Sequence, residues 1–413
     1  MSSEQDATAG ATTLEELYRD LHAHPELSFR ENRTAGIAAD RAEAAGFEVI
    51  RGVGRTGVVA VLRNGEGPTV LLRADMDALP VREDTGLPYA SQVTDTDENG
   101  HEVPVMHACG HDVHVTCLVG ALERLAADRA EWSGTLIALF QPAEEIGGGA
   151  RAMVDDGLFE RVGKPDVVLG QHVAPMPAGW VGAHPGPAFA AADALRVRLF
   201  GRGGHGSRPE TTIDPVVMAA ATVLRLQTVV AREVAGADTA VLTVGSLRAG
   251  TKENVIPDDA ELGLSIRSYT EPVRERVLEG VRRIVHAEAA ASGAVKDPEI
   301  TVVDSFPVLV NDPETTDRTM NAFRTEFGDA QVVAPGPVSG SEDVGVLATA
   351  AGAPLCYWLL GGADPAAFAA AANGGTADSE VPSNHSPKFA PVIEPTLTTG
   401  VRALVTAART WLA

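Results

Sequence analysis

The stretch TVLLRADMD, residues 69–77, decides the fold, because an apolar run ends there on two carboxylates, Asp75 and Asp77. An apolar run of this length predicts a strand buried on both faces of a sheet. Similar β-branched runs occupy residues 57–63, 134–140 and 166–173. Helical spacing of apolar residues marks residues 14–22, 33–45 and 112–127. Strands that alternate with helices predict an α/β domain, with a mixed sheet covered by helices on both faces.

A second pattern begins near residue 187. The elements predicted from it are a strand, a helix, two strands, a helix and a strand, at residues 192–202, 214–232, 239–250, 258–269, 272–291 and 299–306. This order is that of a ferredoxin-like α+β domain. We therefore expect residues 187–302 to be a domain inserted between two parts of the α/β domain, residues 1–186 and 303–413.

The α/β pattern resumes after the insert. The segment PLCYWLLGG, residues 354–362, predicts another buried strand. The alanine-rich segment that follows, residues 362–382, also contains Gly, Asn and Pro. Because these residues interrupt regular structure, we expect a loop there rather than a packed helix.

Composition and charge exclude several classes of protein. The chain has 413 residues and a formal net charge of −23, with acidic residues spread along it. A negative field of this size repels phosphate backbones, so nucleic-acid binding is not expected. No run of eighteen apolar residues predicts a membrane span, and the polar N-terminus lacks the features of a signal peptide. Three cysteines do not form a disulfide framework, so we expect a cytoplasmic protein.

Polar side chains follow several predicted strands at the point where each strand ends. Asp75 and Asp77 end the first run, Glu144 and Glu145 follow the run at 134–140, and His172 lies in the last run. Ligand sites of α/β sheets lie beyond the carboxyl ends of the strands. The sequence therefore predicts a functional site at this edge of the sheet.

The segment MHACGHDVH, residues 106–114, holds three of the eleven histidines and one of the three cysteines. Cys109 and His111 lie two residues apart, beside a glycine and just before a predicted helix. Thiolate and imidazole suit zinc, and imidazole also suits manganese, cobalt or nickel. The alternative is a buried cysteine beside helix-capping residues, but the polar residues at the other strand ends favour a metal site. His107 and His114 would then have supporting or structural roles.

The carboxylates at the strand ends suit acid–base chemistry. Because the side chains of Glu144 and Glu145 diverge, one can bind a metal while the other serves as general base. Either Asp75 or Asp77 could hold a metal-binding histidine by its other ring nitrogen. The alternatives are solvated glutamates at the start of a helix and aspartates that cap a helix or a turn.

Four further residues are candidates for binding. His385 lies in the turn SNHSPKF, and its alternative is an ordinary surface histidine. His205 is flanked by glycines that would let its ring reach out of the inserted domain. Asn254 offers an amide donor, and the guanidinium of Arg267 could clamp a carboxylate through two hydrogen bonds. Taken alone, neither His205 nor Asn254 nor Arg267 is distinctive.

Eight motifs occur in order along nearly the whole chain: RDLHAHPELSFRE, RADMDALP, MHACGHDVH, FQPAEE, GRGGHGSRP, ENVIPD, GSED and NHSPKF. Together they resemble the aminoacylase and carboxypeptidase group of dinuclear metallopeptidases. Within that group they are similar to the amidohydrolase subgroup of hippurate hydrolases and indole-acetyl-amino-acid hydrolases.

The resemblance implies two divalent metal ions, zinc, manganese, cobalt or nickel, and a set of site residues. The implied metal ligands are Cys109, His111, Glu145, His172 and His385. The implied catalytic residues are Glu144, as general base and acid, and Asp77, as a support for the metal site. The inserted domain would be a lid that forms a homodimer. His205 and Asn254 would bind the substrate with Arg267, and His205 could act in the partner's site.

The resulting expectation is an amidohydrolase that uses metal-activated water and Glu144 to split N-acyl amino acids or related small amides into an acid and a free amino acid. A dipeptidase or carboxypeptidase on the same scaffold is the first alternative, and Cys109 in place of an aspartate argues against it. The second alternative is a non-catalytic binding protein. A retained general base argues against that alternative, because a binding protein does not need one.

Overall fold

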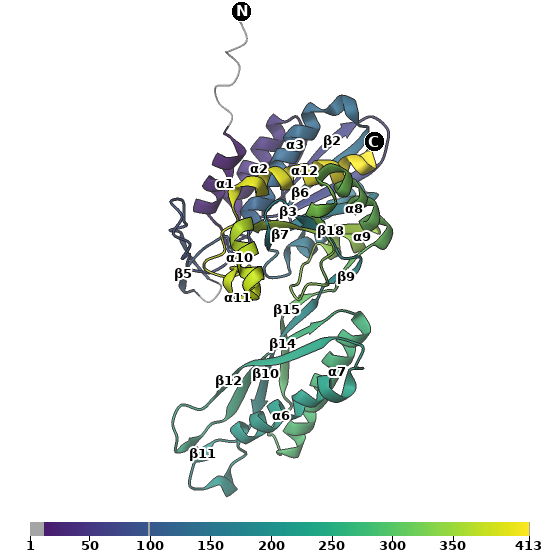
Figure 1. Cartoon of the computed structure of the whole chain (residues 1–413). Helices are drawn as coiled ribbons and strands as arrows, with labels where there is room; N and C mark the ends of the chain where they lie inside the picture. Colours follow the sequence, from purple (N-terminus) through teal and green to yellow (C-terminus); the bar gives the residue numbers. More distant parts are fainter. Residues whose placement is uncertain (1–11, 98–99, 413) are drawn as a thin grey trace, which may run out of the picture. The chain divides into compact units, whose positions relative to one another are not determined.

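A computed structural model describes residues 12–97 and 100–412, and it separates the chain into two compact units (Figure 1). Unit 1 comprises Met1–Gly186, Asn311–Pro335 and Val346–Ala413. Unit 2 comprises Pro187–Val310 and the short segment Gly336–Gly345. The roles of the insert as lid and dimerisation domain stay predictions.

Unit 1 is built on an eight-stranded mixed sheet. Its strands are, in spatial order, β1 (Glu48–Val53), β2 (Gly57–Asn64), β6 (Gly134–Gln141), β3 (Thr69–Asp75), β7 (Val167–Pro177), β18 (Leu355–Ala363), β8 (Val181–Gly182) and β17 (Val332–Val333). The four central strands run parallel, from β6 through β3 and β7 to β18. Parallel strands end at the same edge, so Asp75 at the end of β3, the glutamates after β6 and His172 in the second half of β7 are brought to one place.

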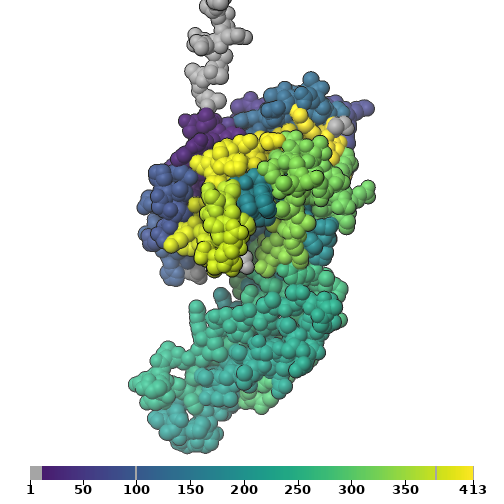
Figure 2. Space-filling model, in the orientation of Figure 1, coloured from purple at the N-terminus to yellow at the C-terminus, as the bar shows by residue number. Residues whose placement is uncertain are grey.

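Helices bury both faces of this sheet. Val70 and Leu72 of β3 lie in one apolar cluster with residues of α1 (Leu14–Ala23), α2 (Asn32–Ala44), α3 (His111–Ala127) and α12 (Ile393–Leu412). Leu71 points the other way and is also fully buried. The C-terminal residues, yellow in Figure 2, form part of the outer surface of unit 1. A sheet covered on both faces is the predicted α/β fold, which is confirmed.

Unit 2 has a four-stranded antiparallel sheet in the order β12-β14-β10-β15. In chain order its main elements are β10 (Ala191–Phe200), α6 (Pro215–Glu233), β12 (Ala240–Ala249), β14 (Asp259–Ser268), α7 (Glu271–Ala291) and β15 (Glu299–Phe306). Val229 of α6 and Ile284 of α7 pack in one cluster with the sheet residues Leu262 and Ile266. The predicted ferredoxin-like order is confirmed.

Most of the remaining elements are short. They are β4 (Thr94–Thr96), β5 (Glu102–Pro104), α4 (Gly149–Asp155), α5 (Leu158–Val162), β9 (Gly186–Phe189), β11 (Gly204–His205), β13 (Val255–Ile256), β16 (Leu309–Asn311), α8 (Pro313–Phe327) and α9 (Gly345–Ala351), with 3₁₀ turns at Arg129–Glu131, Pro209–Thr211 and Asp329–Gln331.

The expectation of a loop at residues 362–382 is wrong. This segment contains α10 (Pro365–Gly374) and α11 (Ala377–Glu380). Asp364 caps α10, since its Oδ1 accepts the Ala367 amide at 2.8 Å, and Pro365 takes the first helical position. Alanine has the highest helix propensity, and it outweighs the Gly and Asn that end the helix.

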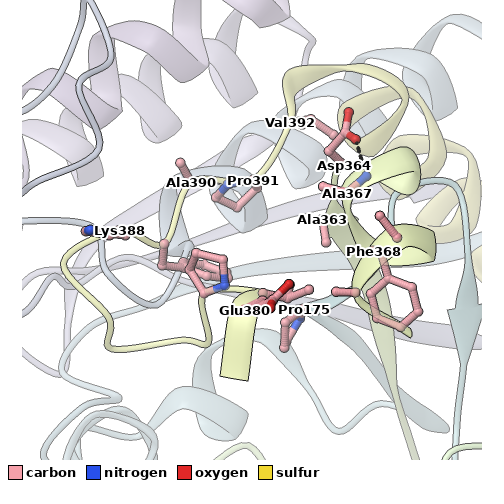
Figure 3. Close-up of a pocket in the computed structure, with 16 residues that line it drawn as sticks. Pro175, Ala363, Asp364, Ala367, Phe368, Glu380, Lys388, Ala390, Pro391 and Val392 are labelled. Atoms are coloured by element: carbon pink, nitrogen blue, oxygen red, sulfur yellow. Dashed lines mark hydrogen bonds between the residues drawn. The ribbon is translucent and has the colours of Figure 1, made fainter. Parts of the chain in front are cut away.

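The segment around α10 and α11 also lines an apolar pocket of about 430 Å³ (Figure 3). Phe368 projects from α10, and the opposite wall comes from residues 388–392. None of the predicted site residues is among the residues that line this pocket.

Among the described residues, one helix is long and apolar enough, by length and composition alone, to cross a membrane. It is α6, Pro215–Glu233, whose apolar residues are interrupted by polar ones and so form no continuous apolar run of eighteen. Core helices of soluble proteins pass the same test. One face of α6 packs on the sheet of unit 2 through Met218, Leu226 and Val229, as the face of an amphipathic helix does.

Candidate metal centre

The segment between β5 and α3 brings Cys109 and His111 to the carboxyl edge of the sheet. Gly110 lies between them with φ +81°, and a Cβ there would lie 2.3 Å from Cγ1 of Val173. Only glycine fits this left-handed, crowded position. The turn at Gly110 then leads directly into α3, which begins at His111, and it places Cys109 and Gly110 beside His172 and Val173 of β7.

The five predicted metal ligands come together in unit 1. Sγ of Cys109 lies 3.5 Å from Nε2 of His172, and Nε2 of His385 lies 3.4 Å from Oε2 of Glu145. Nε2 of His111 lies 3.8 Å from Oε1 of Glu145. Two groups of ligand atoms, each within 4.8 Å of one another, share the cysteine: Cys109 with His111 and His172, and Cys109 with Glu145 and His385. This arrangement offers two neighbouring cation positions.

Two polar atoms in this cluster are buried without a hydrogen bond to the described residues. They are Nε2 of His111 and Oε1 of Glu145, whereas Nδ1 of His111 faces Asp77. An unsatisfied buried donor or acceptor costs about 1–3 kcal/mol, so such atoms call for a partner. A divalent cation with thiolate, imidazole and carboxylate ligands fits both the chemistry and the position of these atoms.

Most of these ligands would have to lose a proton to bind a cation. Burial alone lowers the pKa of His111, but the carboxylates of Asp75, Asp77 and Glu145 outweigh it and raise the pKa to about 10. Burial raises the pKa of the Cys109 thiol well above its usual range, and burial raises the pKa of Glu145 to about 8. Burial holds the pKa of His172 well below its usual range, which keeps this imidazole neutral as a metal ligand must be. A bound cation stabilises thiolate and carboxylate, so its binding would release protons.

Asp77 connects the cluster to the turn that carries the two glutamates. Its Oδ1 accepts the Glu144 amide at 3.0 Å, and its Oδ2 accepts the Glu145 amide at 3.0 Å. Its Oδ1 also lies 3.4 Å from Nδ1 of His111. The Ser28 hydroxyl donates to Oδ2 at 2.7 Å. A single carboxylate thus orients a candidate metal ligand and the candidate general base.

His114 has a structural role. Its Nε2 accepts the amide of Val173 at 2.8 Å, and its Nδ1 donates to Asp75. Because both ring nitrogens are engaged, His114 cannot ligate a cation without breaking one of these bonds. His107 is buried as well, and burial lowers its pKa to about 4, so its ring is neutral at physiological pH.

Sequence reasoning missed two charged residues near the centre, Arg73 and Glu31. Arg73 is fully buried in β3, and its guanidinium donates to Asp75, to Gln141 at 3.0 Å and to the Tyr357 hydroxyl at 3.1 Å. A single arginine inside an apolar run is the signal that could have found it, since a buried charge requires partners. Glu31 gave no such signal, because glutamate before a helix is ordinary.

The predicted substrate-binding residues all lie in unit 2. His205 of β11 is exposed, and its Nδ1 accepts the Ser207 amide at 3.1 Å. The Gly206 amide donates to the backbone carbonyl of Asn254 at 2.9 Å, so the fold brings His205 and Asn254 to adjacent backbone segments. Arg267 of β14 donates to the Ser341 hydroxyl. Their part in binding a substrate stays a prediction.

Comparisons with known proteins agree with this chemistry. The sequence pattern of peptidase family M20/M25/M40 matches residues 71–408. Thermostable carboxypeptidase 1 of Saccharolobus solfataricus is 38% identical over 351 residues, which cover 84% of this chain and 85% of that protein. Hippurate hydrolase of Campylobacter jejuni is 38% identical over 336 residues, which cover 80% of this chain and 84% of that protein.

A solved structure adds the metal content of a relative. The crystal structure of the YXEP protein of Bacillus subtilis, described as a dinuclear metal-binding peptidase from family M20, has a TM-score of 0.75. It is 30% identical and covers 97% of each chain. The predictions of a metallopeptidase-type family and of a hydrolase are confirmed. The chain belongs to peptidase family M20/M25/M40.

Proposed function

We propose that this protein is a metal-dependent amidohydrolase that cleaves the amide bond of N-acyl amino acids, giving a carboxylic acid and a free amino acid. The observation that carries the proposal is the pair of three-residue ligand groups that share Cys109, with Glu144 beside them. The similarity to hippurate hydrolase, whose name denotes cleavage of an N-acyl amino acid, supports this choice of substrate.

Two divalent ions would be held by Cys109, His111, Glu145, His172 and His385. Zinc, manganese, cobalt and nickel all accept such ligands. When bound, the ions would polarise the amide carbonyl and lower the pKa of water.

Glu144 would move the proton. Its carboxylate is buried, and Oε2 lies 3.9 Å from Nε2 of His111, so it can approach a water molecule held at the centre. It would accept a proton from the attacking water and pass it to the leaving nitrogen, a contribution typically on the order of 10²–10⁴-fold. Asp77 would keep Glu144 in place through the backbone amide.

Residues of unit 2 would hold the substrate. His205 and Asn254 would donate hydrogen bonds to the oxyanion that forms when the carbonyl is attacked. Arg267 would bind the carboxylate of the amino-acid part, which suits its planar pair of donors. Substrates without this carboxylate should then bind more weakly.

A carboxypeptidase or dipeptidase is the second candidate function. It is favoured by the similarity to thermostable carboxypeptidase 1, which equals the similarity to hippurate hydrolase in identity. Both reactions would use the same ligands and the same general base. They differ only in whether an acyl group or an aminoacyl group precedes the broken bond.

We also propose a cytoplasmic homodimer formed through unit 2. The edge strand β12 exposes Val241 and Leu247, and the neighbouring helix α6 exposes Leu224, 73% of whose surface is accessible. Exposed apolar residues beside an open strand edge favour pairing with a second copy. The three free cysteines suit a reducing compartment. Light scattering coupled to gel filtration would give the mass in solution.

The test of the function is amine release from N-acyl amino acids and dipeptides, with added manganese or zinc and with a chelator control. Cleavage of the acyl amino acids that the chelator abolishes is the expected result. Cleavage of dipeptides alone would replace the proposal with the second candidate. No cleavage of either class by protein with two bound ions would contradict both.

A further inference from the structure

The turn that carries Glu144 and Glu145 is held through hydrogen bonds from its backbone amides. Three successive amides, those of Ala143, Glu144 and Glu145, each donate to a buried carboxylate. Asp77 accepts the second and third. Glu31, from a different part of the chain, accepts the first, at 2.8 Å. The turn therefore depends on two carboxylates, of which only Asp77 belongs to the predicted site.

Glu31 lies at the N-cap position of α2, but its side chain does not cap that helix. The carboxylate turns inward and is fully buried. Oε1 accepts the amides of Phe29 and Ala143, both at 2.8 Å, and Oε2 accepts the Thr56 hydroxyl at 2.5 Å. Burial raises the pKa of Glu31 to about 7. A buried carboxyl group is costly, so its placement here indicates a specific role.

The two amides that share Oε1 belong to residues in a disfavoured conformation. Phe29 has φ +61° and Ala143 has φ +48°, and neither is glycine. Left-handed backbone is unfavourable for such residues, and it persists only where surrounding contacts enforce it. Glu31 supplies a contact of this kind to both residues at once. It therefore ties the loop at residues 28–31 to the turn that carries the glutamates.

A second connection runs in parallel. Ser28, next to Phe29, donates to Asp77, which accepts the amides of Glu144 and Glu145. The loop at 28–31 thus reaches the turn by two routes, one through Glu31 and one through Asp77.

We propose that Glu31 is a positioning residue that sets the orientation of Glu144 and Glu145 through the backbone of Ala143. This inference rests on the proposed function, in which Glu145 binds a metal and Glu144 moves the proton. Loss of Glu31 would let the turn relax, which would weaken metal binding and slow the chemical step together.

The test compares three substitutions of Glu31 in the full-length protein. Glu31→Gln keeps the reach and an oxygen acceptor but removes the charge. Glu31→Asp keeps the charge but is too short to reach both loops. Glu31→Ala removes both. Each variant is measured for kcat, for KM and for the dissociation constants of zinc, obtained by competition with a chromophoric chelator.

Glu31→Ala should weaken zinc binding and lower kcat, each by about tenfold or more, as loss of a group that orients metal ligands does. KM should change by less than about twofold, since the substrate contacts remain. Glu31→Asp should resemble Glu31→Ala, whereas Glu31→Gln should stay within about threefold of the parent protein.

Glu26 provides a matched control. It lies two residues before the loop at 28–31, and its carboxylate accepts two backbone amides, those of Arg33 and Thr34, in the first turn of α2. Glu26→Ala should lower the melting temperature but leave zinc affinity and kcat within about twofold of the parent.

Several outcomes would overturn the inference. Parental zinc affinity and kcat in Glu31→Ala would do so, and so would equal losses in Glu26→Ala. If Glu31→Ala does not fold, the other two variants decide: an unimpaired Asp variant with an impaired Gln variant would show that charge matters and reach does not. If the parent protein cleaves no amide, the proposed function fails, while zinc affinity still tests the role of Glu31.

Discussion

The metal centre of unit 1 and the substrate residues of unit 2 differ in how they are built. In unit 1, Asp77 and His111 are buried, and backbone amides and other side chains hold Asp77 in place. In unit 2, His205 and Asn254 are exposed, and the backbone and side-chain hydrogen bonds described above join them to Ser207 and Gly206. Preorganised groups suit chemistry that needs fixed geometry, and exposed groups can adapt to a substrate. We expect substitutions in unit 1 to affect turnover and those in unit 2 to affect turnover less and binding more.

The largest effect should come from the general base. Glu144→Gln keeps the size of the side chain and cannot accept the proton, so kcat should fall on the order of 10³-fold. Metal content, measured by plasma emission, should stay at the parental value. Turnover within about threefold of the parent would contradict the role of Glu144 as base.

The second prediction concerns the stability of unit 1, which contains a buried histidine between two carboxylates. His22 of α1 donates from Nδ1 to Asp112 at 2.7 Å and from Nε2 to Glu83 at 3.0 Å, and all three groups are buried. Burial alone lowers the pKa of His22, but the two carboxylates outweigh it and raise the pKa to about 10. At pH 6, His22→Gln should reduce the free energy of unfolding by about 3 kcal/mol, because two buried carboxylates lose their partner.

This destabilisation should depend on pH in one direction. A histidine whose folded pKa lies above its unfolded value of about 6.5 contributes its full stabilisation below that value, and loses it as pH rises through the folded pKa. The difference between parent and His22→Gln should therefore shrink steadily from pH 6.5 toward about pH 10. Urea unfolding at pH 6, 7.5 and 9 measures it, with His24→Gln as the control for loss of an exposed histidine near the same helix. A difference that grows with pH would refute the charged state of His22.

The third prediction concerns unit 2 and the dimer. His205→Ala should lower turnover by about 10²-fold, the loss typical of one oxyanion donor. If His205 acts in the partner's site, mixing this variant with Glu144→Gln should restore part of the activity, since one site of a mixed dimer has both groups intact. Verified mixed dimers without recovered activity would exclude action across the interface.

The smallest effect should be on substrate binding. Arg267→Lys keeps the charge but loses the planar pair of donors, so KM for N-acyl amino acids should rise by about tenfold with little change in kcat. The matched substrate is the amide without the carboxylate, for which the variant and the parent should have similar KM values. An equal rise for both substrates would place Arg267 away from the carboxylate.

Much of the fold could be predicted from the sequence, because both sheets follow strong local patterns. Buried β-branched runs marked the parallel strands, and their polar ends marked the edge where the site lies. The prediction failed at α10, where the helix propensity of alanine and the cap of Asp364 outweighed the Gly and Asn. When a segment makes few packing contacts, the local sequence pattern does not show whether helix-forming or helix-breaking residues will prevail.

The roles within the site depend on contacts that sequence spacing does not contain. His111 and His114 lie three residues apart on one helix, and it is the contacts with the Val173 amide and the Asp75 carboxylate, both from strands of the sheet, that make His114 structural. Glu31 is a stronger case. Its sequence position predicts a helix cap, whereas its carboxylate holds Ala143, more than a hundred residues away. Such roles follow from tertiary structure alone.

The split of unit 1 across the chain has a consequence for biosynthesis. The ligand group of Cys109, His111 and His172 is complete before unit 2 is made, whereas the group that contains His385 must wait for the last part of the chain. A ribosome-bound nascent chain could therefore capture one ion early and the second only after β18 has joined the sheet. Binding of both ions would then indicate that the N-terminal and C-terminal parts of unit 1 have assembled. A truncated polypeptide that lacks His385 would bind one ion rather than two.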